Sequence, residues 1–398
     1  MIRVGIVVSA VDRNWIGGLN YLANLVNAIL AAPNRKVEPV LLVSDRTPDD
    51  IVVMFPKVET IRSAIVREGT ILRKVRKVFE RGLGRDLIAE AFLRRHRIDV
   101  LSHSDQLGRS AGLPTIGWIA DFQHLRMPQF FTPAEREARD RGFRRLAENC
   151  RIILLSSEDA RKDLATFAPQ AMPRARLLRF VSATGDAIEP TPASRLRDMY
   201  GLPERFIYLP NQFWAHKNHG VVVDALAIVR TRGESVSVVC TGKTDDHRTP
   251  HYFPELRQKI RDNGVEDTIR ILDMVPYADV KGLFRACVAV LNPSKFEGWS
   301  TSVEEAKSLG KRVILSDIPV HREQAPDRGR FFEPDDAEAL AGLLIEETRT
   351  ANSLEDEQHL AQAEKLLKSR FTEFGRIYSD IVLEAARSGT STGRIRYP

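Results

Sequence analysis

The stretch VAVLNPSKFEGWSTSVEEAKSLGKRVILS, residues 288–316, decides the fold, because it places two apolar runs on either side of one short helix. VAVLN (288–292) and KRVILS (311–316) have the β-branched composition of buried parallel strands, and VEEAKSL between them has the pattern of a helix. Two strands joined through a helix form the unit from which parallel sheets are built. The stretch therefore predicts an α/β protein.

The alternation of apolar runs with helical stretches recurs through the rest of the chain and is interrupted once. Further apolar runs stand at 2–8, 38–44, 98–102, 115–119, 151–156 and 176–180, and again at 205–210, 235–242 and 268–273. A polar, proline-containing passage at 182–194 separates the two groups. A chain of 398 residues exceeds one ordinary core. We predict two Rossmann-like domains, 1–185 and 195–368, facing a central cleft lined by loops that follow strands.

Composition places the chain among ordinary globular enzymes. It has 43% apolar and 28% charged residues, which argues against disorder. Its three cysteines lie far apart, which argues against a disulfide framework or a zinc site and fits a reducing compartment. The apolar opening MIRVGIVVSA is too short to span a membrane, so it predicts a strand rather than a signal peptide. The expected location is cytoplasmic.

Two carboxylates, Glu297 and Glu305, flank the turn between the strand and the helix of the opening stretch. The N-terminus of a helix carries positive dipole charge and suits an anion. Carboxylates beside a bound phosphate would accept hydrogen bonds from neutral hydroxyls, so the combination indicates a sugar nucleotide. The alternative is structural: Ser302 with Glu305, or Thr301 with Glu304, matches a helix capping box.

Two other loops after strands carry candidate ligand groups. Lys217, in NQFWAHKNH, stands directly before the predicted helix start at Asn218. A cation there makes sense if a shared anion neutralises it and the helix terminus, so we interpret Lys217 as a diphosphate ligand rather than a solvated lysine. Gly17 and Gly18 precede the first helix and would let backbone amides approach a ligand, although a plain loop explains them equally.

The loop after the strand at 115–119 holds Asp121 and His124, which we assign to the acceptor side. A single histidine is more often a hydrogen-bonded structural group than a catalyst, so that alternative stays open. The chain contains no Asp-x-Asp triplet, the carboxylate pair that commonly holds Mg²⁺ or Mn²⁺ against a diphosphate. No metal and no cofactor is therefore expected.

Positive charge is concentrated between Arg62 and Arg97, where 11 Lys/Arg stand against four acids, an excess of 7. Alternation of arginines with apolar residues there predicts an amphipathic helix that lies on an anionic membrane surface. A solvated helix face is the alternative. The segment matches no nucleic-acid module, so no nucleic-acid partner is expected.

The string FEGWSTSVEEAKSLGKRVILSDIPVHRE resembles the E-x7-E signature of retaining GT-B glycosyltransferases of family 4. NQFWAHKNH resembles the lysine-bearing loop of its bacterial surface-polysaccharide subgroup, and WIADFQHLRMPQFF followed by ILLSSEDARKDL resembles its acceptor-domain segment. The resemblance implies a GT-B fold in which a C-terminal helix, 371–388, crosses back to the first domain. It also implies metal-independent transfer of a hexose with retention of configuration.

The resemblance assigns roles to single residues. Glu305 would bind the ribose, Glu297 the donor-sugar hydroxyls and Lys217 the diphosphate, which Gly18 would face. The full set implied is catalytic Glu297, Lys217 and His124; donor-binding Gly18, Gln212, Lys217, Glu297, Trp299, Ser300, Thr301 and Glu305; and acceptor-side Gly17, Asp121 and His124. The chain departs from the family at Ala120, where many members have histidine, and at Gln212, where many have arginine.

These observations predict a hexosyltransferase that moves a sugar, mannose as first choice, from a GDP- or UDP-linked donor. The acceptor would be a glycan or lipid-linked oligosaccharide in bacterial surface-polysaccharide synthesis, at the inner face of the membrane. Two alternatives stay open. A GT-B sugar-nucleotide epimerase would convert the donor without an acceptor, and a transfer-incompetent partner subunit would only bind nucleotide or glycan.

Overall fold

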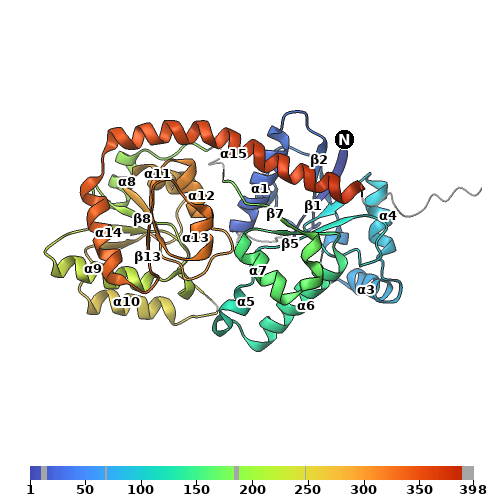
Figure 1. Ribbon diagram of the computed structural model, residues 1–398, viewed down its shortest axis with the longest axis horizontal. Coiled ribbons are helices and arrows are strands. Elements are labelled where there is room, and N and C mark those ends of the chain that lie inside the picture. Colours follow the sequence, from blue (N-terminus) through green and yellow to red (C-terminus); the bar gives the residue numbers. More distant parts are fainter. Residues whose placement is uncertain (10–15, 68–69, 183–187, 247, 388–398) are drawn as a thin grey trace, which may run out of the picture. The chain divides into compact units, whose positions relative to one another are not determined.

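A computed structural model describes residues 1–9, 16–67, 70–182, 188–246 and 248–387 (Figure 1). The chain divides into two compact units. Unit 1 comprises Met1–Pro128, Thr132–Ser182 and Ser369–Pro398, and unit 2 comprises Gln129–Phe131 and Ala183–Lys368. The segment Thr132–Ser182 of unit 1 thus ends at the start of the polar passage 182–194 that separates the two groups of predicted strands.

Unit 1 is built on a seven-stranded parallel sheet with the order β3-β2-β1-β4-β5-β6-β7. Its strands are β1 (Ile2–Val8), β2 (Val37–Val43), β3 (Thr60–Arg62), β4 (Val100–Ser102), β5 (Thr115–Ile119), β6 (Ile152–Leu155) and β7 (Ala175–Leu177). β1 pairs with β2 on one side and with β4 on the other, all in parallel. The strand order reverses there, so the loops after β1 and β4 flank the point where Rossmann-like sheets bind ligands.

The helices between Ile16 and Phe167 in unit 1 are α1 (Ile16–Ala31), α2 (Asp49–Val52), α3 (Ile71–Leu83), α4 (Leu87–Arg95), α5 (Gln123–Arg126), α6 (Pro133–Asn149) and α7 (Glu158–Phe167). Of these, α4, α6 and α7 contribute side chains to two apolar clusters that include residues of the sheet. Ends of several helices follow ordinary capping chemistry: Thr132 and Glu135 form a capping box at the start of α6. The three cysteines of the chain are free and buried in the two units.

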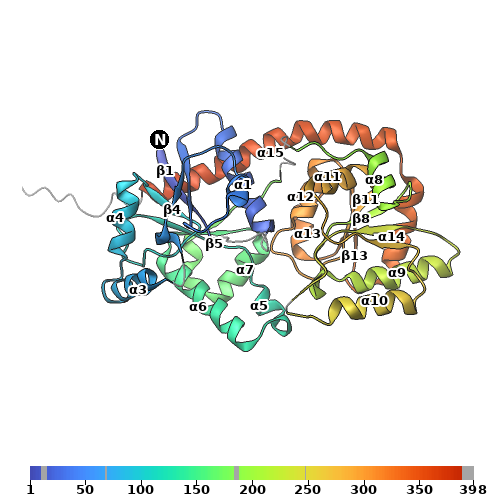
Figure 2. The same ribbon diagram turned by 180° about the vertical axis from the view of Figure 1, so that it is seen from behind.

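Unit 2 repeats the arrangement with a six-stranded parallel sheet of order β10-β9-β8-β11-β12-β13 (Figure 2). Its strands are β8 (Ile207–Leu209), β9 (Val238–Cys240), β10 (Ile269–Ile271), β11 (Ala289–Asn292), β12 (Arg312–Ser316) and β13 (Gly329–Phe332). Its helices are α8 (Ala193–Tyr200), α9 (His219–Thr231), α10 (Tyr252–Asp262), α11 (Tyr277–Ala286), α12 (Thr301–Ser308), α13 (Pro319–Gln324) and α14 (Ala337–Thr350). The switch point of this sheet lies between β8 and β11.

The predicted α/β class with two Rossmann-like sheets is confirmed, and the opening stretch forms β11, α12 and β12. Two strands were missed, β3 and β13, which both lie at a sheet edge. An edge strand packs against only one neighbour and can be short and partly exposed, so it lacks a long apolar run. The final helix also begins earlier than expected: α15 runs over Ser353–Arg387 rather than starting at 371.

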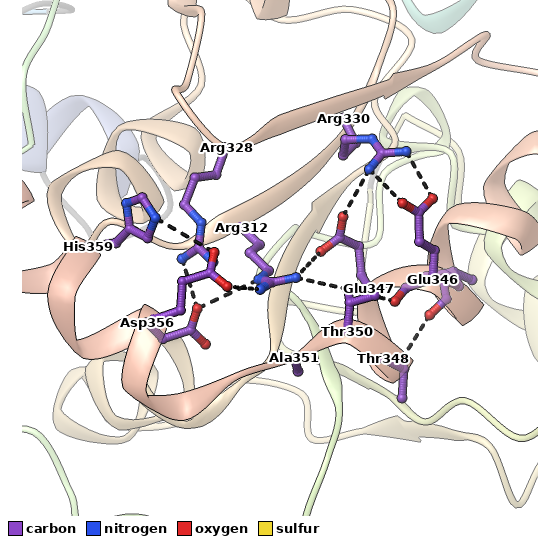
Figure 3. A network of polar contacts seen from close by, with 12 residues as sticks. Arg312, Arg328, Arg330, Glu346, Glu347, Thr348, Thr350, Ala351, Asp356 and His359 are labelled. Carbon is purple, nitrogen blue, oxygen red and sulfur yellow. Dashed lines mark hydrogen bonds and ion pairs between the residues drawn. The ribbon is translucent and has the colours of Figure 1, made fainter.

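An ion-pair network anchors the first turns of α15 to the strands of unit 2 (Figure 3). Arg328 donates to Asp356 at 2.8 Å and to Glu355 at 3.0 Å. Arg312, at the start of β12, donates to Glu355 at 3.1 Å and to Glu347 of α14 at 3.2 Å. Both arginine side chains are only 11% exposed, so the network fixes the corner between α14 and α15.

Helix α3 is attached to unit 1 by buried charges. Arg73 and Arg76 are each 1% exposed. Arg76 Nε donates to Asp86 Oδ2 at 2.7 Å, and Arg73 Nη1 lies 3.7 Å from the same carboxylate while it donates to Glu80 of α3 itself at 3.1 Å. Asp86 also caps α4 by accepting from the Ala89 amide at 3.0 Å. These two arginines are therefore internal and do not take part in the basic surface that the segment 62–97 predicts.

Within the part of the chain that the structure describes, no helix is long and apolar enough to cross a bilayer.

Replacing Asp86 by alanine should destabilise unit 1, because it leaves two buried guanidinium groups facing no carboxylate at this position. Loss of one partner from a buried ion pair costs about 3–5 kcal/mol. Thermal unfolding followed by circular dichroism should show a large drop in midpoint. Asp49→Ala is the matched control, since Asp49 pairs with Arg62 but its side chain is 93% exposed. Equal midpoints for the two variants would contradict the structural role of Asp86.

Candidate functional site

The loops after β8 and β11 meet at the switch point of unit 2, because these two strands are neighbours in the sheet. The first loop ends in a short 3-10 turn, Ala215–Lys217, and Asn218 follows in the left-handed conformation at φ 59°. The side-chain amide of Asn218 donates to the backbone carbonyl of Pro293 in the second loop at 3.2 Å. This contact holds the two loops together.

Lys217 and Glu297 form an ion pair between these loops. Lys217 Nζ donates to Glu297 Oε1 at 2.7 Å, and the two side chains are 14% and 9% exposed. Burial by itself would raise the pKa of Glu297, but the charge and hydrogen bond of Lys217, with a hydrogen bond from Ser294, lower this pKa to about 2. Glu297 is therefore ionised throughout the physiological pH range. Both side chains of the pair keep a small exposed surface.

Asn292, the last residue of β11, organises the polar groups around the pair. It is fully buried, and its amide donates to Ser300 Oγ at 2.9 Å and to Ser302 Oγ at 3.2 Å. Its side-chain oxygen accepts from the side-chain amide of Asn211 at 3.0 Å, so it also ties β11 to the loop after β8. The start of α12 is thereby fixed relative to both loops.

Helix α12 begins at Thr301, with Ser300 as the N-cap whose Oγ accepts from the Val303 amide. Both capping-box alternatives are therefore wrong, since neither Thr301 nor Ser302 is the capping residue. Glu304 instead accepts a hydrogen bond from Gln324 at 3.0 Å. Trp299 and Thr301 are half-buried on either side of the cap. The helix N-terminus thus directs backbone amides of this turn toward the same region as the ion pair.

Glu305 lies one turn after Ser302 on the same face of α12. It is 8% exposed, and its carboxylate accepts from Tyr277 Oη at 3.3 Å. Burial raises its pKa to about 7, against a usual value of 4.5, and the Tyr277 hydrogen bond lowers this pKa only in part. Glu305 makes no hydrogen bond to Lys217 or Glu297 among the described residues. The two acids therefore differ in environment: one is ion-paired, and the other is close to half-protonated at neutral pH.

Gln212, the other residue assigned to the donor, lies in the loop after β8. Its Oε1 accepts from the Lys243 amide at 3.1 Å, which leaves its amide group as the part able to donate to a ligand. It adds no charge, so Lys217 and the helix termini are the positive groups at this position.

In unit 1, the donor residue Gly18 and the acceptor-side residues Gly17, Asp121 and His124 that the sequence predicts lie in two different segments. Gly17 and Gly18 form the first turn of α1, where Gly17 is exposed and Gly18 is buried. Asp121 accepts from the Gln123 amide at 2.9 Å. His124 is 1% exposed, pairs with Asp140 at 2.9 Å, and packs edge-to-face on Phe143. This packing favours the structural alternative for His124, and its catalytic role stays a prediction without support from its surroundings.

The sequence did not point to a polar chain that supports α1. Tyr378 Oη donates to Ser102 Oγ at 2.7 Å, Ser102 contacts His103 Nδ1 at 2.9 Å, and His103 Nε2 contacts Tyr21 Oη at 3.0 Å. Burial lowers the pKa of His103 to about 3, so the chain is uncharged. Tyr21 lies on α1 and stacks on Trp118 at 4.4 Å. The chain fixes the helix whose first turn carries the two glycines.

Comparison with known proteins relates most of unit 2 to a known family. Residues 204–346 match the family model described as glycosyl transferases group 1. The chain carries a glycosyl transferases group 1 domain. This domain contains the ion pair, the α12 cap and Glu305.

Two curated relatives share part of the chain. The O-antigen chain mannosyltransferase RfbU of Salmonella typhimurium is 28% identical over 142 residues, covering 35% of this chain and 38% of the relative. The GDP-mannose:cellobiosyl-diphosphopolyprenol alpha-mannosyltransferase of Komagataeibacter xylinus is 27% identical over 199 residues, covering 48% and 49%. The chain thus spans less than half the length of either relative.

Solved structures match over the whole length and establish the fold. Anabaena HepE in complex with UDP and glucose has a TM-score of 0.65 at 16% identity, covering 98% of this chain and 100% of HepE. A glycosyltransferase from Rickettsia africae has a TM-score of 0.67 at 13% identity, covering 98% and 99%. The fold around the group 1 domain is therefore GT-B, as the sequence predicts.

Three further residues of the group 1 domain were missed by sequence reasoning: Asn292, Tyr277 and His321. His321 is fully buried on α13, donates from Nδ1 to the Ser316 carbonyl at 2.9 Å, and has its pKa lowered by burial. Asn292 had a detectable signal, since it is a polar residue that ends an apolar strand. Tyr277 and His321 follow other strands and are brought to the site only by the tertiary fold.

The charge state of Glu305 should make nucleotide binding depend on pH. A carboxylate accepts hydrogen bonds from ribose hydroxyls better than a carboxylic acid, so we expect GDP and UDP to bind more tightly as pH rises through about 7. Glu305→Gln should remove this dependence. Isothermal titration of both proteins with the same nucleotide isolates the effect, because protonation of the diphosphate is common to both. Identical pH profiles would contradict a ribose role for Glu305.

The raised pKa of Glu305 also determines how the stability of the chain changes with pH. In the folded chain Glu305 keeps its proton up to about pH 7, whereas in the unfolded chain it loses it near 4.5. The folded state therefore binds more protons in this window, and the free energy of unfolding falls as pH rises through it. Glu305→Gln should melt at a higher temperature than the wild-type chain at pH 8 and at a similar temperature below pH 4.5.

Proposed function

We propose that the chain is a retaining hexosyltransferase that moves mannose from GDP-mannose to a glycan or lipid-linked acceptor in the synthesis of a bacterial surface polysaccharide. The observation that carries the proposal is the buried ion pair of Lys217 and Glu297 beside the N-terminus of α12, inside a glycosyl transferases group 1 domain. RfbU and the Komagataeibacter enzyme are both mannosyltransferases, which supports the choice of sugar.

In this proposal each group of the site has a chemical task. A nucleotide diphosphate placed at the start of α12 would meet the Lys217 ammonium and the backbone amides near Trp299 and Ser300. Glu297, held ionised by Lys217, would accept hydrogen bonds from hydroxyls of the donor sugar. Glu305, carried on the same face of the helix as Ser302, would accept hydrogen bonds from the ribose. No metal enters this scheme, because Lys217 and the helix N-terminus would offset the diphosphate charge.

The proposed transfer joins the acceptor to the sugar in one displacement. The oxygen of the acceptor hydroxyl forms a bond to the anomeric carbon while the bond from that carbon to the diphosphate oxygen breaks. The acceptor proton passes to an oxygen of the leaving diphosphate on the same face of the sugar, so the configuration is retained. The role of the protein is to orient donor and acceptor and to stabilise the charge that develops on the leaving group.

A charge-matched double variant separates function from stability at the ion pair. Lys217→Met alone leaves Glu297 buried without its cation, which should cost about 3 kcal/mol or more and abolish transfer. Lys217→Met combined with Glu297→Gln removes both charges and should restore much of the unfolding midpoint. Transfer should stay reduced by about 10²-fold or more, because the groups that position the donor are gone. A stable double variant with normal transfer would show that the pair is only structural.

The donor can be identified by its effect on stability. A ligand that binds only the native state at about 100 times its Kd adds about 2.7 kcal/mol to the free energy of unfolding. In a thermal-shift series with GDP, UDP, ADP and dTDP sugars, we expect the largest rise with GDP-mannose. A larger rise of the unfolding midpoint with a sugar linked to another base would reject GDP-mannose as the donor. Incubation of the donor alone, followed by analysis for an isomer, tests the epimerase alternative.

A further inference from the structure

The outer face of helix α3 is apolar, although α3 lies at the surface of unit 1. Ile71, Val75 and Val78 are 80%, 46% and 69% exposed. These residues are spaced i, i+4 and i+7, so at about 100° per residue they form one stripe along the helix. We call them the α3 outer stripe. A surface helix of a soluble domain normally turns such a stripe toward the core.

The reason for the reversed orientation is the charge on the opposite face. Arg73 and Arg76, which lie on the other side of the helix from the stripe, are directed inward: Arg76 pairs with Asp86 at 2.7 Å, and Arg73 lies 3.7 Å from Asp86 and 3.1 Å from Glu80 of the same helix. The contacts with Asp86, the N-cap of α4, connect this face of α3 to the rest of unit 1. The α3 outer stripe on the opposite face remains outside.

The surroundings of the stripe add exposed apolar groups and positive charge. Leu83, Leu87 and Ile88, at the end of α3 and the start of α4, are 56%, 47% and 40% exposed. The two helices pack against each other at the edge of unit 1, as both views show (Figures 1 and 2). Six of the exposed large apolar side chains in the described part of the chain thus fall between Ile71 and Ile88.

Exposed charge on these two helices has one sign. Lys74, beside the stripe, is exposed, as are Arg94 and Arg95 on α4. The acids of the same helices and their connection are turned inward: the side chains of Glu80, Asp86 and Glu90 are 12%, 0% and 3% exposed, and each is paired with arginine. An apolar face bordered by cations and without exposed acids matches a surface that is apolar beneath and anionic at its headgroups.

We propose that α3 is a membrane-docking helix, which inserts the α3 outer stripe into the interface of an anionic lipid bilayer while Lys74 contacts lipid phosphates. A second copy of this chain fits less well, because two such faces would bring like charges together. The docking does not require the proposed transfer reaction, so its test is independent of that reaction.

Sedimentation with lipid vesicles tests the proposal on the full chain. The wild-type protein should pellet with vesicles of phosphatidylcholine mixed with phosphatidylglycerol and bind vesicles of phosphatidylcholine alone much more weakly. Ile71→Ser, Val75→Ser and Val78→Ser combined should lower the partition coefficient by more than about tenfold, because three apolar groups lose their place in the interface. Lys74→Gln alone should lower it by about fivefold and make it less dependent on salt.

The matched control carries the same number of serine substitutions at exposed apolar sites elsewhere. Val53, Met199 and Leu354 are 77%, 48% and 64% exposed, and their combined replacement by serine should leave vesicle binding unchanged. Circular dichroism and GDP binding should be the same for both triple variants, which excludes misfolding. Equal vesicle binding by the stripe variant and the control overturns the proposal. Stripe-dependent self-association in light scattering without vesicle binding also overturns it, in favour of a second copy.

Discussion

The arrangement of unit 2 depends on one constraint, the burial of opposite charges in the loops that follow two neighbouring strands. Glu297 can lie 9% exposed as a carboxylate only because Lys217 meets it at 2.7 Å. A buried charge without a partner would cost several kcal/mol, so the loop after β8 and the loop after β11 have to be held in contact. The Asn218 and Asn292 hydrogen bonds provide that contact. The pair therefore links the position of α9 to that of α12.

This constraint also explains why the two acids of the domain differ. Glu297 has a cation and stays ionised, whereas the partner of Glu305 is the neutral Tyr277 hydroxyl, and burial raises the pKa of Glu305 to about 7. A buried carboxylate with a neutral partner would gain more from a ligand that offers hydrogen-bond donors than one that is already ion-paired. The folded chain thus satisfies one acid with a cation and the other with a neutral hydroxyl.

The sequence predicted what depends on local pattern and missed what depends on the tertiary fold. Interior strands such as β1 and β11 were recognised because burial on both faces produces apolar runs, whereas the edge strands β3 and β13 need no such run. The helix turn after β11 was located, but its cap was not: Ser300, Thr301 and Ser302 are equivalent in sequence, and the hydrogen bonds of the Gln324 side chain with the backbone of Ser300 fix that residue at the cap.

The basic segment 62–97 also shows a feature that depends on the tertiary fold and that the sequence could not predict. An amphipathic helix at α3 follows from periodicity, and the structure has one. Which face points inward does not follow, because arginines usually face solvent and apolar residues usually face the core. The outcome is decided by Asp86, which is fully buried while capping α4 and offers a carboxylate that only a cation can satisfy. Arg76 turns inward to meet it, and the helical period then forces Ile71, Val75 and Val78 outward. A single buried carboxylate on a neighbouring helix thus determines the chemistry of the surface that unit 1 presents.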